Sequence, residues 1–281
     1  LVAARGHPGR YQLTNETMPF NLNDSFAWSF HHPEHRFATT MRGNPLIDSE
    51  RNIVISTEQA IFKLDSNGQM LWAAPSPTRA PLNVVPSLLD GAVYGMAMDA
   101  TIFALNLSTG MEIWRTRHAE NIGGDTAYVD ARDGILLASV DHSPNHDGGN
   151  MRVLGLNISE GSKLWEVTID LPTWNFNPLF PGDGSVIFMD VSGGVHCLDH
   201  ETGKRHWHAR VPEQFNASFT DGGVSLSQDG KAAFACSNNA NDADGVLRAY
   251  RTGDGSLMWE KLLPTGCTSW PVIARTNNWG V

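Results

Sequence analysis

Histidine and acidic residues gather in two runs whose side chains could ligate a metal ion. The first run, "HHPEH" at 31–35, holds three His in five residues. Because neighbouring strand residues point to opposite faces, it is interpreted as a solvated or structural linker. The second run, "DHSPNHDGGN" at 141–150, supplies Asp141, His142, His146 and Asp147. A metal site requires its ligands to converge on one ion. We interpret this second run as a loop that contacts a partner or is solvated, so no metal ligand is assigned.

An Asn- and Asp-rich segment at 237–245, "SNNANDADG", partly matches a calcium-binding loop. The match fails because Ala240 stands where the loop pattern requires its first Asp. Loops positioned by a rigid scaffold are common places for binding residues. We therefore expect Asn239, Asp242 and Asp244, like the run at 141–150, to be candidate partner contacts.

Two histidines flank a tryptophan in "RHWHA" at 205–209. His206 and His208 are two residues apart, so on a strand they share the face opposite that of Trp207. We expect both at the surface. The sequence assigns no catalytic residue and no cofactor-binding residue.

The composition is typical of a globular, acidic protein. It has 281 residues with 41% hydrophobic content, nine Trp and twelve Phe, which is ample for a packed core. Its formal net charge is −10, and no Lys/Arg run exceeds two residues, which argues against nucleic acid and anionic membranes as partners. Apolar runs stay well below the ~18 residues of a membrane-spanning helix, so no direct membrane insertion is expected.

One turn recurs five times along the chain. Each copy has a Gly four residues before a Trp, as in "KLDSNGQMLW" (63–72), "ALNLSTGMEIW" (104–114), "GLNISEGSKLW" (155–165), "CLDHETGKRHW" (197–207) and "AYRTGDGSLMW" (249–259). Asp-Gly pairs, a strong hairpin signal, lie upstream at 90–91, 133–134, 183–184 and 229–230. A repeat of ~40–50 residues with strand-like segments indicates a propeller.

Each unit is predicted to hold four short antiparallel strands. In the second unit these are "NVVPSLL", "AVYGMAM", "TIFALNL" and "EIWRTRH", with turn residues between them. The fold class predicted is therefore an all-β propeller, with five full blades from about 38 to 264 and partial flanking blades. In this geometry the turns between second and third strands share one face with the connectors between blades. We call this the loop face; the opposite edge, with the recurring turns, is the turn face.

The recurring Gly and Trp have structural roles. The Gly supplies a positive φ for the turn between the third and fourth strands. The Trp lies on the outer strand, where it can cover the joint between blades and donate its indole N–H to a backbone acceptor. This predicted docking motif comprises Trp28, Trp72, Trp114, Trp165, Trp207 and Trp259 with Gly68, Gly110, Gly161, Gly203 and Gly255.

The pattern Ala-Leu-Asp-x-x-Thr-Gly-x-x-x-Trp in these five segments resembles the tryptophan-docking motif of the quinoprotein-type, PQQ-like repeat family. The stretch from Trp28, "WSFHHPEHRFATTMRGNPLID", resembles that family's outer strand leading into the next blade. The resemblance covers about residues 24–281 and implies a ring of seven or eight blades. We therefore expect an N-terminal extension at 1–23 and a propeller at 24–281 that is incomplete at its C-terminal end.

The family contains both dehydrogenases and catalytically silent scaffolds. Its dehydrogenases use PQQ with acidic and amide calcium ligands, an Asp base and often a neighbouring Cys pair, and no residue set here matches them. The expected function is a non-catalytic scaffold that binds other protein subunits in a larger assembly, with no cofactor. The alternatives are a fragment of a PQQ- and calcium-dependent dehydrogenase, and binding of a small ligand or carbohydrate in the central funnel.

Cysteines and glycosylation sequons bear on the compartment. Cys236 and Cys267 are both expected near the loop face, so a disulfide between them is predicted, with Cys197 as a buried free thiol. Candidate glycosylation sites are Asn15, Asn23, Asn106, Asn157 and Asn216. The expected location is extracytoplasmic: secreted, periplasmic or in an organelle lumen.

Overall fold

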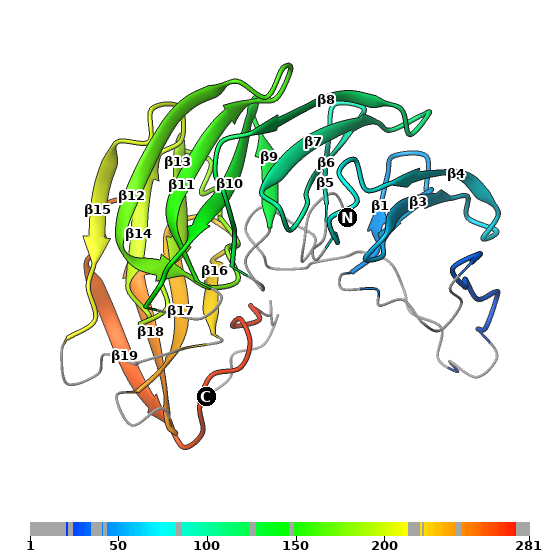
Figure 1. The fold of residues 1–281 in the computed structure, drawn as a ribbon. Coiled ribbons are helices and arrows are strands. Elements are labelled where there is room, and N and C mark those ends of the chain that lie inside the picture. Colours follow the sequence, from blue (N-terminus) through cyan, green and yellow to red (C-terminus); the bar gives the residue numbers. More distant parts are fainter. Residues whose placement is uncertain are drawn as a thin grey trace.

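Five antiparallel sheets stand side by side around an arc in the computed structural model (Figure 1). The structure describes residues 21, 25–34, 41, 44–82, 86–123, 128–145, 149–212, 220, 222–239 and 243–273. These contain strands and turns and no helix. The predicted all-β propeller of antiparallel blades is confirmed.

Each sheet is one blade, with its strands in sequence order. Blade one contains β1 (Leu46–Ile47), β2 (Ile53–Ser56), β3 (Ala60–Leu64) and β4 (Met70–Pro75). Blade two contains β5 (Ser87–Leu89), β6 (Ala92–Met96), β7 (Thr101–Asn106) and β8 (Glu112–Arg117). Blade three contains β9 (Val129–Arg132), β10 (Ile135–His142), β11 (Asn150–Asn157) and β12 (Lys163–Thr173). Blade five contains β16 (Gly223–Leu226), β17 (Ala232–Asn238), β18 (Gly245–Arg251) and β19 (Leu257–Leu263).

Blade four has three named strands, β13 (Ser185–Met189), β14 (Val195–Asp199) and β15 (Arg205–Ala209). An isolated antiparallel bridge between Leu179 and Ile187 takes the place of its first strand. Pro178 and Pro181 flank Leu179 on either side. Because proline has no backbone N–H to donate, the pairing does not extend into a ladder.

The core lies in the seams between adjacent blades. Central strands such as β3 and β7 are buried along almost their whole length. Blades one and three cover the two faces of β7, whereas β3 packs against blade two on one face and against Trp28 and Phe30 on the other. Outer strands such as β8 and β19 are largely exposed. One core cluster joins blades two and three, with Met96 and Ile102 packed against Leu136 and Leu154. The other seams have corresponding clusters.

A tryptophan crosses each seam and lies on the glycine turn of the following blade. An ideal Cβ placed on Gly68, Gly110, Gly161, Gly203 or Gly255 would fall 2.5–2.8 Å from the ring of Trp28, Trp72, Trp114, Trp165 or Trp207 respectively. Each indole Nε1 also donates to a backbone carbonyl of that turn, for example Trp72 to Leu107 at 3.0 Å and Trp114 to Ile158 at 2.8 Å. Trp259, on blade five, is 42% exposed.

Candidate functional site

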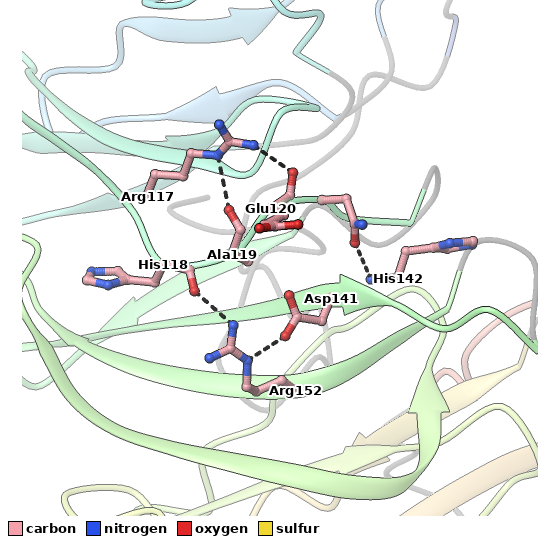
Figure 2. A pocket seen from close by; sticks show the side chains of 8 residues that line it. Arg117, His118, Ala119, Glu120, Asp141, His142 and Arg152 are labelled. Carbon is pink, nitrogen blue, oxygen red and sulfur yellow. Dashed lines mark hydrogen bonds and ion pairs between the residues drawn. The ribbon is translucent and has the colours of Figure 1, made fainter.

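A pocket of about 1020 Å³ opens on the loop face between blades two and three. Its first wall is the end of β8 and the connector that follows it, residues 117–121. Its second wall is made by the paired ends of β10 and β11, which contribute Asp141, His142 and Arg152 (Figure 2). Two neighbouring blades therefore build one concave, polar surface.

Arg152 ties the two walls together. Its guanidinium contacts Asp141 Oδ2 at 2.7 Å and Glu166 Oε2 at 2.9 Å, and its third nitrogen donates to the His118 carbonyl at 2.8 Å. Partial burial acts to lower the pKa of Arg152, but the hydrogen bonds and charges of Asp141 and Glu166 outweigh burial and raise it. The cation thus stays charged and holds the connector of blade two against blade three.

Backbone contacts fix the connector itself. Arg117 folds back on it and donates to the carbonyls of Ala119 at 3.0 Å and Glu120 at 2.6 Å. Asn121 receives two hydrogen bonds from blade three, one to its carbonyl from the Asp141 N–H at 3.1 Å and one to its side-chain oxygen from the His142 N–H at 2.9 Å. These hydrogen bonds therefore position the pocket wall against blade three.

The pocket presents groups that suit recognition more than catalysis. Arg117, Glu120 and Asn121 are exposed at its mouth. Asp141 accepts from the Arg152 guanidinium, so its carboxylate is already engaged by a cation. A fixed surface of mixed charges and amides can pair with the polar groups of a protein partner and set its orientation.

The structure brings together some of the predicted contact residues and separates others. Asp141 and His142 line the pocket, whereas Asn239 and Asp244 lie at the β17–β18 turn of blade five, where the Asn239 N–H donates to the Asp244 carbonyl at 2.7 Å. His146, Asp147 and Asp242 lie outside the described residues. Sequence reasoning missed the connector 117–121 and Arg152. One signal could have found the connector: in a propeller the connectors between blades lie on the loop face, next to the turn that follows β10.

Comparison with known proteins places the chain in a family. The family model described as "Outer membrane protein assembly factor BamB" matches residues 22–177 and 149–276. The chain belongs to the BamB family of PQQ-like propellers. An outer membrane protein assembly factor BamB of Burkholderia pseudomallei is 27% identical over 156 residues, which cover 56% of this chain and 37% of that protein.

Solved structures share the fold of this BamB-family chain. BamB from Moraxella catarrhalis superposes with a TM-score of 0.59 at 18% identity, covering 80% of this chain and 63% of that one. A europium-containing methanol dehydrogenase superposes with a TM-score of 0.65 at 14% identity, covering 91% of this chain and 58% of that one. At these identities the likeness shows the fold alone. The chain spans less than two thirds of each of these proteins.

The cysteines of this BamB-family propeller fall into two groups. Cys236 at the end of β17 and Cys267 in the segment after β19 form a disulfide, with their Cα atoms 5.9 Å apart. Cys197 on β14 is free and buried, and burial raises the pKa of its thiol to about 11. Its thiolate is therefore scarce at neutral pH, which argues against a role as nucleophile.

Two of the five sequons lie in described turns on the turn face. The Asn106 side-chain oxygen accepts from the N–H groups of Ser108 and Thr109 at 2.9 and 3.0 Å, and that of Asn157 accepts from Ser159 at 2.8 Å. Asn15, Asn23 and Asn216 lie outside the described residues. Use of any of these sites for glycosylation stays a prediction.

The first histidine run is partly buried in the structure. His32 is 8% exposed and sets its ring edge-on against Phe62, with ring centres 5.1 Å apart. Its Nδ1 accepts from the Glu34 N–H at 3.1 Å. His32 is therefore a packing residue of blade one, and His35 lies outside the described residues.

The expectation that His208 is a surface residue was wrong. His206 is exposed, but the side chain of His208 is only 10% exposed and lies against Asp190 and His196. The cause is the long β12, which reaches Thr173 and pairs there with Asp190. Asp170 and Leu171 of β12 line one cavity together with His208, so the end of β12 lies beside that ring.

Asp190, His196 and His208 are the one group of three converging His, Cys, Asp or Glu ligands among the described residues. Two imidazoles and one carboxylate differ from the oxygen-only ligand set that calcium prefers. These residues therefore do not fit a calcium-bound quinone.

Proposed function

We propose that this protein is a non-catalytic propeller scaffold that binds another protein subunit through the loop-face pocket between blades two and three. The observation that carries the proposal is the Arg152 network, which fixes a concave surface of mixed charge before any partner arrives. A preorganised surface binds more tightly because little conformational entropy is lost on association.

Two further findings support the proposal. Relatives are named outer membrane protein assembly factors, so their role is in assembling other proteins. The Cys236–Cys267 disulfide is typical of an oxidising compartment, which supports an extracytoplasmic location. The partner we infer is a protein subunit of an extracytoplasmic assembly, and its docking surface must offer polar groups that complement both charge signs.

Charge reversal at the pocket mouth tests the proposal. Glu120→Lys changes an exposed pocket residue, and Glu201→Lys is the matched control, because Glu201 is an exposed Glu on the turn face of blade four. The readout is the size of the native assembly on a calibrated column and the affinity of the isolated partner. We expect Glu120→Lys to weaken association about tenfold, equivalent to ~1.4 kcal/mol, and Glu201→Lys to leave it unchanged. Equal effects of the two variants would contradict the proposal.

A further inference from the structure

A row of aromatic rings crosses blade four close to its loop face. Phe188 on β13 pairs with His196 on β14, and His196 pairs with His208 on β15. The rings stack in that order, with ring centres 5.1 Å apart for the first pair and 3.8 Å apart for the second. Strand register therefore fixes both imidazoles on one side of the blade, next to the turn that begins at Asp190.

Asp190 directs one carboxylate oxygen at both imidazoles. Its Oδ1 accepts from the N–H groups of Ser192 at 3.0 Å and Gly194 at 2.8 Å, which orients the carboxylate. Its Oδ2 lies 2.9 Å from His196 Nε2 and 3.6 Å from His208 Nε2. The carboxylate of Asp190 is only 1% exposed, so a buried acidic group faces the two rings.

These separations suit ligands of a small divalent ion. Two ligand atoms bound at about 2.0–2.1 Å with tetrahedral angles are roughly 3.3 Å apart. The two Asp190–imidazole distances fall on either side of that value, and the three ligand atoms lie within 4.8 Å of one another.

His208 is available as a ligand. Neither of its ring nitrogens has a hydrogen-bond partner among the described residues, although its side chain is nine-tenths buried. Buried polar atoms without a partner are rare because they cost free energy. The two rings are inclined by only 18°, so both Nε2 lone pairs reach one ion only when His208 tilts out of the stack, and no hydrogen bond opposes that tilt.

Gly194 keeps space open beside the two groups. A Cβ on Gly194 would lie 2.4 Å from Asp190 Oδ2 and 3.1 Å from His208 Nε2. Beyond this point is a cavity of about 260 Å³, lined by Asp170, Ser192 and Arg210 together with Asp190 and His208. The cavity can admit an ion and a water molecule as its fourth ligand.

We propose that Asp190, His196 and His208 form a binding site for a zinc-class divalent ion, with three protein ligands and one position open to the cavity. Two imidazoles and one carboxylate are a ligand set that zinc accepts, whereas magnesium and calcium prefer oxygen ligands. The site lies in blade four and is separate from the proposed docking pocket between blades two and three.

Zinc titration of the chelator-treated full chain tests the site. Isothermal calorimetry should show one site per chain for Zn²⁺ and none for Mg²⁺, and Zn²⁺ should raise the melting temperature. His208→Phe keeps the ring stack and removes a ligand, and it should weaken binding on the order of 100-fold. His206→Ala, at an exposed position two residues away on the same strand, is the matched control and should bind like the parent chain.

Cobalt substitution gives a second, spectroscopic readout that reports the coordination geometry of the bound ion. Co²⁺ in a four-coordinate site absorbs visible light strongly, and this band should appear in the parent chain and disappear in His208→Gln. Circular dichroism checks that each variant folds, and Gly194→Ala, which fills the space beside Asp190 Oδ2, should also lose the band. Absence of zinc binding, equal binding in folded His208→Phe and parent protein, or loss of binding in His206→Ala would overturn the proposal.

Discussion

At the residue scale, the recurring turn depends on the lack of a side chain at its glycine. Gly110 has φ of +72° and lies beneath the ring of Trp72, whose N–H is bonded to Leu107 of the same turn. Gly91, in the same blade, has φ of +77° but nothing within 4 Å of an added Cβ. A side chain would therefore strain the backbone at both positions, but only at Gly110 would it also collide with the Trp72 ring.

Gly110→Ala should destabilise the protein more than Gly91→Ala. Both pay about 1–2 kcal/mol for a left-handed backbone conformation, and Gly110→Ala also displaces the Trp72 ring, which overpacking data put at about 1–3 kcal/mol. Urea denaturation followed by tryptophan fluorescence measures the difference. Equal losses of unfolding free energy would show that the Trp72–Gly110 contact contributes little.

A buried ion pair lies beside the same turn. Lys63 Nζ contacts Asp48 Oδ2 at 2.8 Å and donates to the Leu107 carbonyl at 3.1 Å. Burial acts to raise the pKa of Asp48, but hydrogen bonds from Lys63 and Asn52 outweigh the effect of burial, so the pKa is lowered. A carboxyl whose pKa is lower when folded stabilises the protein above its unfolded pKa of about 3.9, and this contribution is lost as pH falls through the folded pKa.

Asp48→Asn should therefore destabilise the protein by about 3 kcal/mol at pH 7, since it leaves Lys63 buried without its anion. It should also flatten the loss of stability below pH 4. The free energy of unfolding at pH 7, 5 and 3.5 is the measurement, with the exposed Glu201→Gln as control. If Asp48→Asn gave a pH profile parallel to that of the parent chain, the pair would not carry this pH dependence.

At the element scale, the repeated local signals in the sequence predicted the strands within each blade, but they did not predict the contacts between blades. The Asp-Gly hairpins and the Gly-to-Trp spacing were sufficient to predict four-stranded blades. They did not predict the interrupted first strand of blade four, where Pro178 and Pro181 limit pairing to one bridge. Nor did they predict the burial of His208, because the end of β12 from the neighbouring blade lies beside it, and local alternation carries no information on such a neighbour.

Blade five has a covalent link of its own. The Cys236–Cys267 disulfide joins the end of β17 to the segment after β19 across 31 residues. Closing a loop of this length removes entropy from the unfolded chain, and the expected stabilisation is about 3–4 kcal/mol.

Replacing both of these cysteines with Ala should lower the unfolding free energy by that amount, whereas Cys197→Ser should leave the disulfide intact. Thiol titration in denaturant provides the check on pairing. The unfolded, unreduced parent chain should expose one thiol, and the reduced chain should expose three. Three reactive thiols without reductant would contradict the pairing.

At the scale of the whole molecule, the seams between blades provide rigidity, and the loop face carries the proposed docking surface. The apolar clusters and the tryptophan contacts hold each blade to the next. The loop face carries the pocket in which blade two meets blade three. Sequence reasoning placed Asp141 and His142 on that face, but the pocket itself needs Arg152 and the connector 117–121. Their convergence depends on how two blades are placed side by side.

Site-specific photo-cross-linking in the native cell tests the proposed role most directly. A photoreactive residue at position 120, in the pocket mouth, is compared with the same residue at position 201 on the turn face, both of which replace an exposed Glu. We predict a discrete protein adduct from position 120 and none from position 201. Adducts from position 201 alone, or from neither position, would contradict a scaffold that binds its partner through the loop face.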